Sequence, residues 1–271
     1  MPLHFGSVTN DSQNSALLAH LVGPVLQRCD RVFVTPDKKY FIAKADMLDK
    51  SSGDVTGEFV FTIWANHEEK RNEILDLDIT LSNPVPTELH FLERLEGSSD
   101  ANEYWDVETV AEEQHLQIET VSRHTVNGDV SDEKCPAYIS AFPFSLSFYD
   151  DIDTFNRMMG FSQISVGDTG LAVSGLSETF LAPGSIMSKN HSDEIFSFVL
   201  GTVESFRDVS VDMGETQLNF VLAQVKTGLG TIPVAMGRSV FDLDDIAPGK
   251  LIAMNADIKA DMARPGVFHK A

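Results

Sequence analysis

Residues 195–262 show the clearest alternation of apolar and polar positions in the chain. In 217–227 (QLNFVLAQVKT), positions of both parities are apolar, which is typical of a strand buried on both faces. Further runs stand at 196–203, 231–236 and 250–258, separated by turns that contain Gly, Pro and Asp. We therefore predict five short strands that curl into a small antiparallel barrel.

A longer polar stretch, 241–249, precedes the last of these strands. Five strands with such a link resemble an OB-like Greek-key barrel in outline, and a plain antiparallel meander accounts for the same pattern. The outline is a fold-level analogy, so it assigns no role to any residue.

The part of the chain before residue 185 also alternates. Its patterns predict a hairpin over 31–45, strands over 58–65, 75–81, 87–95, 115–121 and 137–148, and short helices over 14–21 and 153–159. Pro143 within the last of these strands indicates a bulge or an edge position. The predicted fold class is mainly β, or α+β.

Residues 182–194 (APGSIMSKNHSDE) are polar and contain a Pro-Gly pair, which favours a linker. We therefore expect an acidic, β-rich α+β region over 1–185 and a small β-barrel-like domain over 190–271. The whole chain has 271 residues, enough for two such parts.

Composition favours a soluble, globular protein, since 42% of the residues are hydrophobic and 23% are charged. The apolar run 16–26 is interrupted by His20 and Pro24, and it is too short for a membrane span and a poor match to a signal peptide. Cys29 and Cys135 lack C-x-x-C spacing and fit thiols in a reducing compartment, although one disulfide stays open. We predict a cytoplasmic protein that does not enter membranes.

The formal net charge is −21, and it is unevenly distributed. Residues 1–189 hold 30 acidic residues against 13 basic ones, whereas 190–271 hold 11 against 7. The stretch 88–119 holds ten acidic residues and the single basic residue Arg94. Such a field repels phosphates and anionic lipids and attracts cationic partners, while a need for solubility alone also accounts for it.

Our leading prediction is a non-enzymatic protein-interaction or regulatory module whose acidic surface binds a basic protein partner. Glu108, Glu112 and Glu113 are the predicted partner-binding residues. We expect no nucleic-acid binding, because the barrel aromatics are better explained as core residues than as base-stacking platforms along a basic groove.

Two alternatives stay open. An OB-like nucleic-acid or ligand-binding protein would need Lys226, Arg238 and Lys250 to converge on one face of the barrel. An enzyme would need His67 or His115 to sit in a concave pocket beside a carboxylate.

Candidate chemistry is sparse, since the chain contains no G-x-S-x-G, G-x-x-x-x-G-K-[ST], G-x-G-x-x-G or H-E-x-x-H motif. We therefore predict no catalytic residue, no cofactor and no bound metal. His115, Gln117 and Glu119 would share one strand face, which suits either a divalent-metal site or, as we expect, an ordinary polar outer face. The acidic triplet Asp242, Asp244 and Asp245 favours a turn or a helix N-terminus.

Overall fold

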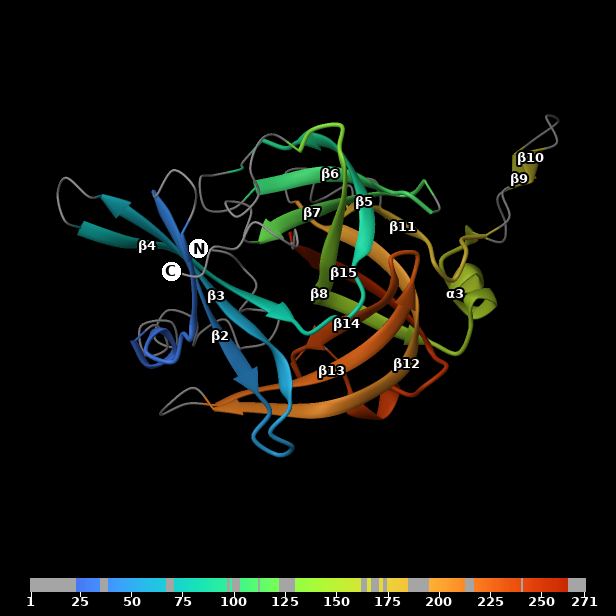
Figure 1. Cartoon of the computed structure of the whole chain (residues 1–271). Helices are drawn as coiled ribbons and strands as arrows, with labels where there is room; N and C mark the ends of the chain where they lie inside the picture. Colours follow the sequence, from blue (N-terminus) through green and yellow to red (C-terminus); the bar gives the residue numbers. More distant parts are fainter. Residues whose placement is uncertain are drawn as a thin grey trace.

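The computed structural model describes residues 23–34, 39–66, 71–96, 98, 103–111, 113–121, 130–161, 165–166, 171–172, 175–184, 195–212, 217–239 and 241–262. Strands dominate these residues and form two main sheets (Figure 1). The predicted class, mainly β or α+β, is therefore confirmed.

Sheet A is an antiparallel meander of β1 (Arg31–Val34), β2 (Tyr40–Leu48), β3 (Val55–Asn66) and β4 (Arg71–Leu81). These strands confirm the predicted hairpin over 31–45 and the strands predicted over 58–65 and 75–81. Phe61 of β3 and Leu77 of β4 are cross-strand partners, and both are buried on the same face of the sheet.

Sheet B contains nine strands among the described residues, in the order β11-β12-β13-β14-β8-β15-β7-β6-β5. Its strands are β5 (Thr87–Arg94), β6 (Glu103–Thr109), β7 (His115–Val121), β8 (Lys134–Tyr149), β11 (Leu181–Pro183), β12 (Ser197–Asp212), β13 (Gln217–Thr227), β14 (Gly230–Met236) and β15 (Leu251–Asp261). Additional β12–β15 and β8–β5 pairings close it into two circuits that share the β8–β15 pair. Two of its pairings, β14–β8 and β15–β7, are parallel.

The long strands β8 and β15 belong to both circuits because different parts of each strand pair with different neighbours: β8 with β5 and β14, and β15 with β12 and β7. The register shifts between Asn255 and Ala256, where Pro143 of β8 faces β15. A bulge at this proline was expected, since proline cannot donate to the ladder.

The strands predicted over 195–262 are found, but they number four and not five. β13 matches its predicted range, and β12 continues for 16 residues through a bulge between Val203 and Ser205. The bulge bends β12 without ending its pairing with β13. The polar link contains the short 3-10 helix η4 (Leu243–Asp245), capped by the Asp242 side chain, which confirms the expected turn or helix N-terminus.

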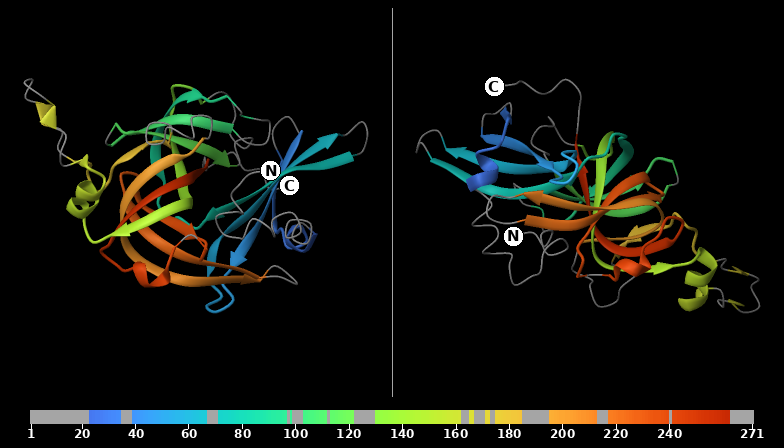
Figure 2. Two further views of the ribbon diagram at one scale, coloured as in Figure 1. Left: turned by 180° about the vertical axis from the view of Figure 1, so that it is seen from behind. Right: turned by 90° about the horizontal axis from the view of Figure 1, so that it is seen from below.

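One hydrophobic core fills the interior of sheet B, with side chains from β5–β8 and from β11–β15. Sheet A packs on the outside of this barrel, where Phe59 and Phe61 join Leu218 and Phe220 in a second core. Figures 1 and 2 show sheet A on one side of the barrel and the helix α3 (Ile152–Met158) on the opposite side.

Buried ion pairs join the other face of sheet A to the barrel. Lys259 of β15 is fully buried, and its Nζ lies 2.6 Å from Asp78 Oδ1 of β4 and 2.7 Å from Glu119 Oε2 of β7. Nearby, Lys44 Nζ of β2 donates to Asp261 Oδ2 at 2.7 Å. Glu119 therefore does not lie on the polar outer face expected for it, because sheet A covers that end of β7.

The helix predicted over 153–159 is confirmed as α3, with Asp151 accepting from the Thr154 amide as N-cap. The helix predicted over 14–21 lies outside the described residues. So does most of the predicted linker, and the division into 1–185 and 190–271 stays a prediction. Strands from both of those parts make up sheet B, with β8 lying between β14 and β15. None of the helices in the described part of the chain has the length and apolar character needed to cross a bilayer.

Candidate functional site

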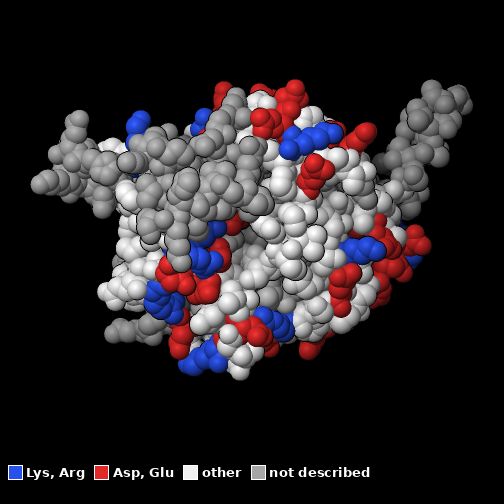
Figure 3. All heavy atoms as spheres, viewed as in Figure 1, with Lys and Arg blue, Asp and Glu red and all other residues white. Residues whose placement is uncertain are grey.

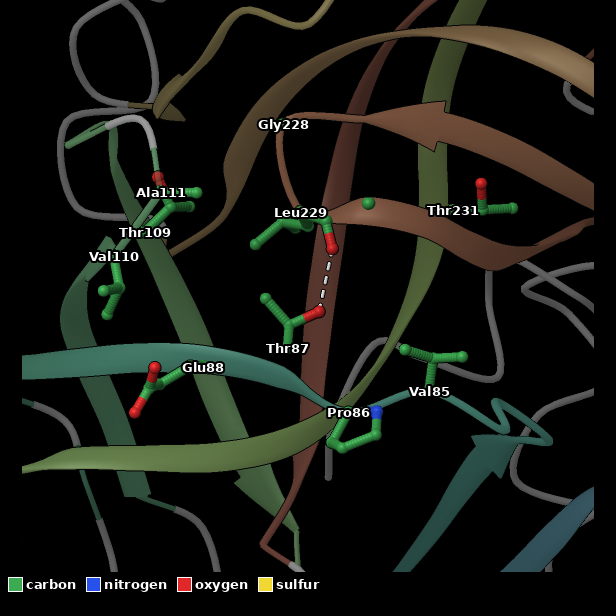
Figure 4. Close-up of a pocket in the computed structure, with 11 residues that line it drawn as sticks. Val85, Pro86, Thr87, Glu88, Thr109, Val110, Ala111, Gly228, Leu229 and Thr231 are labelled. Carbon is green, nitrogen blue, oxygen red and sulfur yellow. Dashed lines mark hydrogen bonds between the residues drawn. The ribbon is translucent and has the colours of Figure 1, made fainter.

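A pocket of about 560 Å³ lies beside the turn between β13 and β14 (Figure 4). Its lining comes from three segments that are far apart in the sequence, 85–88, 109–111 and 228–231. In Figure 4 the residues of 109–111 lie on one side, and Val85 and Thr231 lie on the other. The volume falls within the range of about 300–1,000 Å³ that is usual for ligand pockets.

The pocket forms where two strands that both pair with β8 separate from each other. β5 pairs with β8 over residues 87–90, whereas β14 pairs with β8 only between Val234 and Ala141 in the described chain. The first residues of β14 therefore leave the edge of β8, and the start of β5 takes their place. A hydrogen bond of 2.8 Å from Thr87 Oγ1 to the Leu229 carbonyl ties β5 to the β13–β14 turn (Figure 4).

The walls of the pocket are mainly apolar. Apolar side chains come from Val85, Pro86, Val110, Ala111 and Leu229. Among the 11 lining residues, Glu88 is the one with an ionisable side chain, and it makes no ion pair within the described part of the chain. A bound group would therefore meet apolar walls and one negative charge.

Next to the pocket, the outer face of β5, β6 and β7 places histidines beside carboxylates. The strand register aligns Lys134, His90, Glu108 and His115 in one row. One carboxylate oxygen of Glu108 lies 3.6 Å from His90 Nδ1, and the other lies 3.6 Å from His115 Nε2. His90 Nε2 also lies 3.0 Å from Asp132 Oδ1.

Glu88 precedes His90 by two residues on β5, so both side chains lie on the same side of the sheet. We use the name acidic face for the surface formed by Glu88, Glu93, Asp106, Glu108, Glu113 and Asp132. At the top of the view, above β5 and β6, Figure 3 shows several acidic side chains with a basic side chain between them. Glu88 therefore belongs both to the lining of the pocket and to the acidic face.

The negative charge of Asp106 is only partly compensated by the histidine beside it. Burial raises its pKa, the charge of His115 at 4.0 Å opposes that rise, and the charge of Glu93 adds to it. Its Oδ1 accepts no hydrogen bond within the described residues. A cation brought to this face would stabilise the charged form of Asp106.

Two of the three predicted partner-binding acids lie on the hairpin between β6 and β7. Glu108 points outward from β6, and Glu113 is exposed in the turn with a φ of 52°. Glu112 lies outside the described residues. The structure thus places Glu108 and Glu113 on the acidic face.

The three basic residues considered for ligand binding lie on different elements. Lys226 is exposed on β13, and its cross-strand partner on β12 is residue 202. Arg238 Nη2 lies 2.6 Å from Asp208 Oδ1. Asp208 is six residues further along β12 than residue 202, a separation of about 20 Å in an extended strand. Lys250 Nζ, just before β15, lies 4.0 Å from a carboxylate next to α3. Lys226 and Arg238 are therefore not brought together.

Of the two histidines considered for an enzyme, only His115 can be placed relative to the pocket. His67 lies outside the described residues, and the half-exposed His115 does not line the pocket. Within the described residues, no group of three or more His, Cys, Asp or Glu side chains has the arrangement of metal ligands.

Comparisons with family models, with curated proteins and with solved structures give no match for this chain. Its function is therefore inferred from its own residues.

The sequence prediction missed β6 and the role of His90. The segment EYWDVET alternates, with Trp105 and Val107 buried and Asp106 and Glu108 facing outward. That alternation was a sufficient signal for a strand, although its four polar or acidic positions made it resemble the neighbouring loops. Without β6, the cross-strand alignment of His90 with Glu108 could not be predicted.

Proposed function

We propose that this protein is a non-enzymatic interaction module that binds a basic protein partner through the acidic face. The observation that carries the proposal is that three of the six carboxylates of the acidic face have no cation beside them among the described residues. Glu88, Glu93 and Glu113 make no ion pair within the described part of the chain. Exposed carboxylates of this kind attract a cationic surface and speed its association.

Some acidic residues on other elements do have a cation beside them. The buried carboxylate of Asp49 lies 2.7 Å from Arg207 Nη1, and Asp208 pairs with Arg238. Exposed Asp212 lies 3.4 Å from Lys50. These three cations pair with acids outside the acidic face and do not compensate Glu88, Glu93 or Glu113.

The alternatives stay proposals with less support. An OB-like ligand-binding barrel would use Lys226, Arg238 and Lys250, and two of these already face acids. An enzyme would use His115 with Glu108, outside the pocket. A cytoplasmic location is inferred from composition, and the free thiols of Cys29 and Cys135 are compatible with it.

Binding of a fluorescent oligolysine peptide tests the proposal. A triple variant carries Glu108→Gln, Glu112→Gln and Glu113→Gln. The control variant removes the same total charge from exposed positions on other elements, with Asp54→Asn, Asp150→Asn and Asp244→Asn.

Because exposed ion pairs contribute about 0.2–1 kcal/mol each, we expect the first variant to bind about tenfold more weakly at low salt. The control variant should change affinity much less, and added salt should reduce the difference between the two. Equal weakening in both variants would show that only net charge matters, and it would refute the proposed site.

A further inference from the structure

We propose that the pocket beside the β13–β14 turn binds a lysine side chain of the basic partner, an assignment that rests on the function proposed above. The pocket supplies the two features that such a side chain needs. Apolar walls can cover its methylene stem, and the carboxylate of Glu88, at the start of β5, can receive its ammonium group.

The stem would contact side chains that are now partly exposed to water. Val85 is 65% exposed, although it is a large aliphatic residue, and it faces the pocket opposite Val110 and Ala111. Covering this surface would remove apolar area from water, which favours a ligand with an alkyl chain over a bare cation.

Glu88 is the charged group available to the ammonium. The three hydroxyls of the lining are neutral, and each already makes one hydrogen bond. Thr87 Oγ1 donates to the Leu229 carbonyl, Thr231 Oγ1 lies 3.1 Å from Glu204 Oε2, and Thr109 Oγ1 accepts from the backbone amide of residue 114. Glu88 lacks an ion-pair partner among the described residues, so a positive ligand group would complement it.

The position of the pocket also suits a side chain on a larger partner. Glu88 shares its side of the sheet with His90 and Glu108, so a partner lying along the acidic face passes the mouth of the pocket. The pocket thus selects a lysine of the partner, while the acidic face attracts the positive charge of the rest of the partner surface.

NMR titration of the full chain with N-acetyl-lysine N-methylamide tests this assignment. The matched probe has an acetylated ε-amine, so it has the same stem but no charge. We expect the amide signals of Gly228 and Gly230 to shift with the charged probe, and we expect that probe to bind about three- to fivefold more tightly than the acetylated one.

Three variants separate the contribution of the Glu88 charge from that of the pocket shape. Glu88→Gln should remove the preference for the charged probe, whereas Glu93→Gln removes an equal charge outside the pocket and should keep it. Ala111→Trp narrows the pocket without changing charge and should weaken both probes. Positions 88, 93 and 111 are all exposed, so the variants should unfold at the wild-type temperature.

Equal binding of both probes to the wild type, or shifts that avoid Gly228 and Gly230, would overturn the lysine assignment. If oligolysine still distinguishes the Glu108, Glu112 and Glu113 variant from its control, that failure concerns the pocket alone. If oligolysine binds the triple variant and its control equally while the lysine probe behaves as expected, the proposed function fails. The claim that the bound lysine belongs to a basic partner then fails with it.

Discussion

The buried lysine between sheet A and the barrel allows a quantitative test of how the fold is held together. Lys259 is fully buried, and Asp78 and Glu119 beside it are less than 5% exposed as residues. Replacing it with methionine keeps the length of the side chain and removes its charge. Asp78 and Glu119 would then both lose the buried ammonium group that pairs with them.

We expect Lys259→Met to lower the free energy of unfolding by about 3–5 kcal/mol, the usual cost of breaking a buried ion pair on one side. This is a large part of the roughly 5–15 kcal/mol that a typical domain has. Burial alone would lower the pKa of Lys259, but the charges and hydrogen bonds of Asp78 and Glu119 raise it above the ordinary value.

The raised pKa of Lys259 determines how its contribution to the free energy of unfolding depends on pH. The stabilisation is complete below the ordinary lysine value of about 10.4 and is lost only as the pH rises beyond the pKa in the folded protein. The deficit of the variant should therefore be the same at about pH 7 and about pH 9.

Urea unfolding followed by tryptophan fluorescence measures the effect, because Trp105 is buried in the barrel core. Lys50→Met is the matched control, since Lys50 pairs with Asp212 at 3.4 Å while both are about half exposed. The control should lose no more than about 1 kcal/mol. A loss for Lys259→Met no larger than that of the control would refute the reasoning.

Two further outcomes are expected. Asp106→Asn should stabilise the protein at neutral pH, because burial raises the pKa of Asp106 and disfavours its charged form. This gain in stability should vanish as the pH falls towards the ordinary aspartate pKa of about 3.9. A gain that grows on acidification, measured by thermal unfolding, would contradict the prediction. Trypsin should cut the predicted linker at Lys189 and leave both pieces associated on size-exclusion chromatography, since β8 lies between β14 and β15; spontaneous separation of the pieces would contradict it.

Much of the strand content could be predicted because alternation is a local property. The strands β7 and β13 begin and end where the sequence pattern places them, and Pro143 marks the bulge of β8. The order of the strands was not predictable in this way. β8 enters the barrel between β14 and β15, which are about a hundred residues later, and no local pattern encodes that pairing.

The candidate site was predictable only in part for the same reason. The acidity of 88–119 pointed to the acidic face, but the pocket needs three distant segments to meet. Glu119 and Lys259 also alternate like surface residues. They are buried because sheet A covers that part of the barrel, a tertiary contact that overrides the local pattern.

The most direct test of the acidic face is to map where a basic ligand binds. Amide signals of the isotopically labelled protein would be followed by NMR during titration with oligolysine at low salt. We predict that the largest shifts fall on β5, β6 and β7, at His90, Glu108 and His115, and at the β13–β14 turn. Shifts of similar size over the whole surface, or a cluster of shifts on another sheet, would contradict a dedicated basic-partner site.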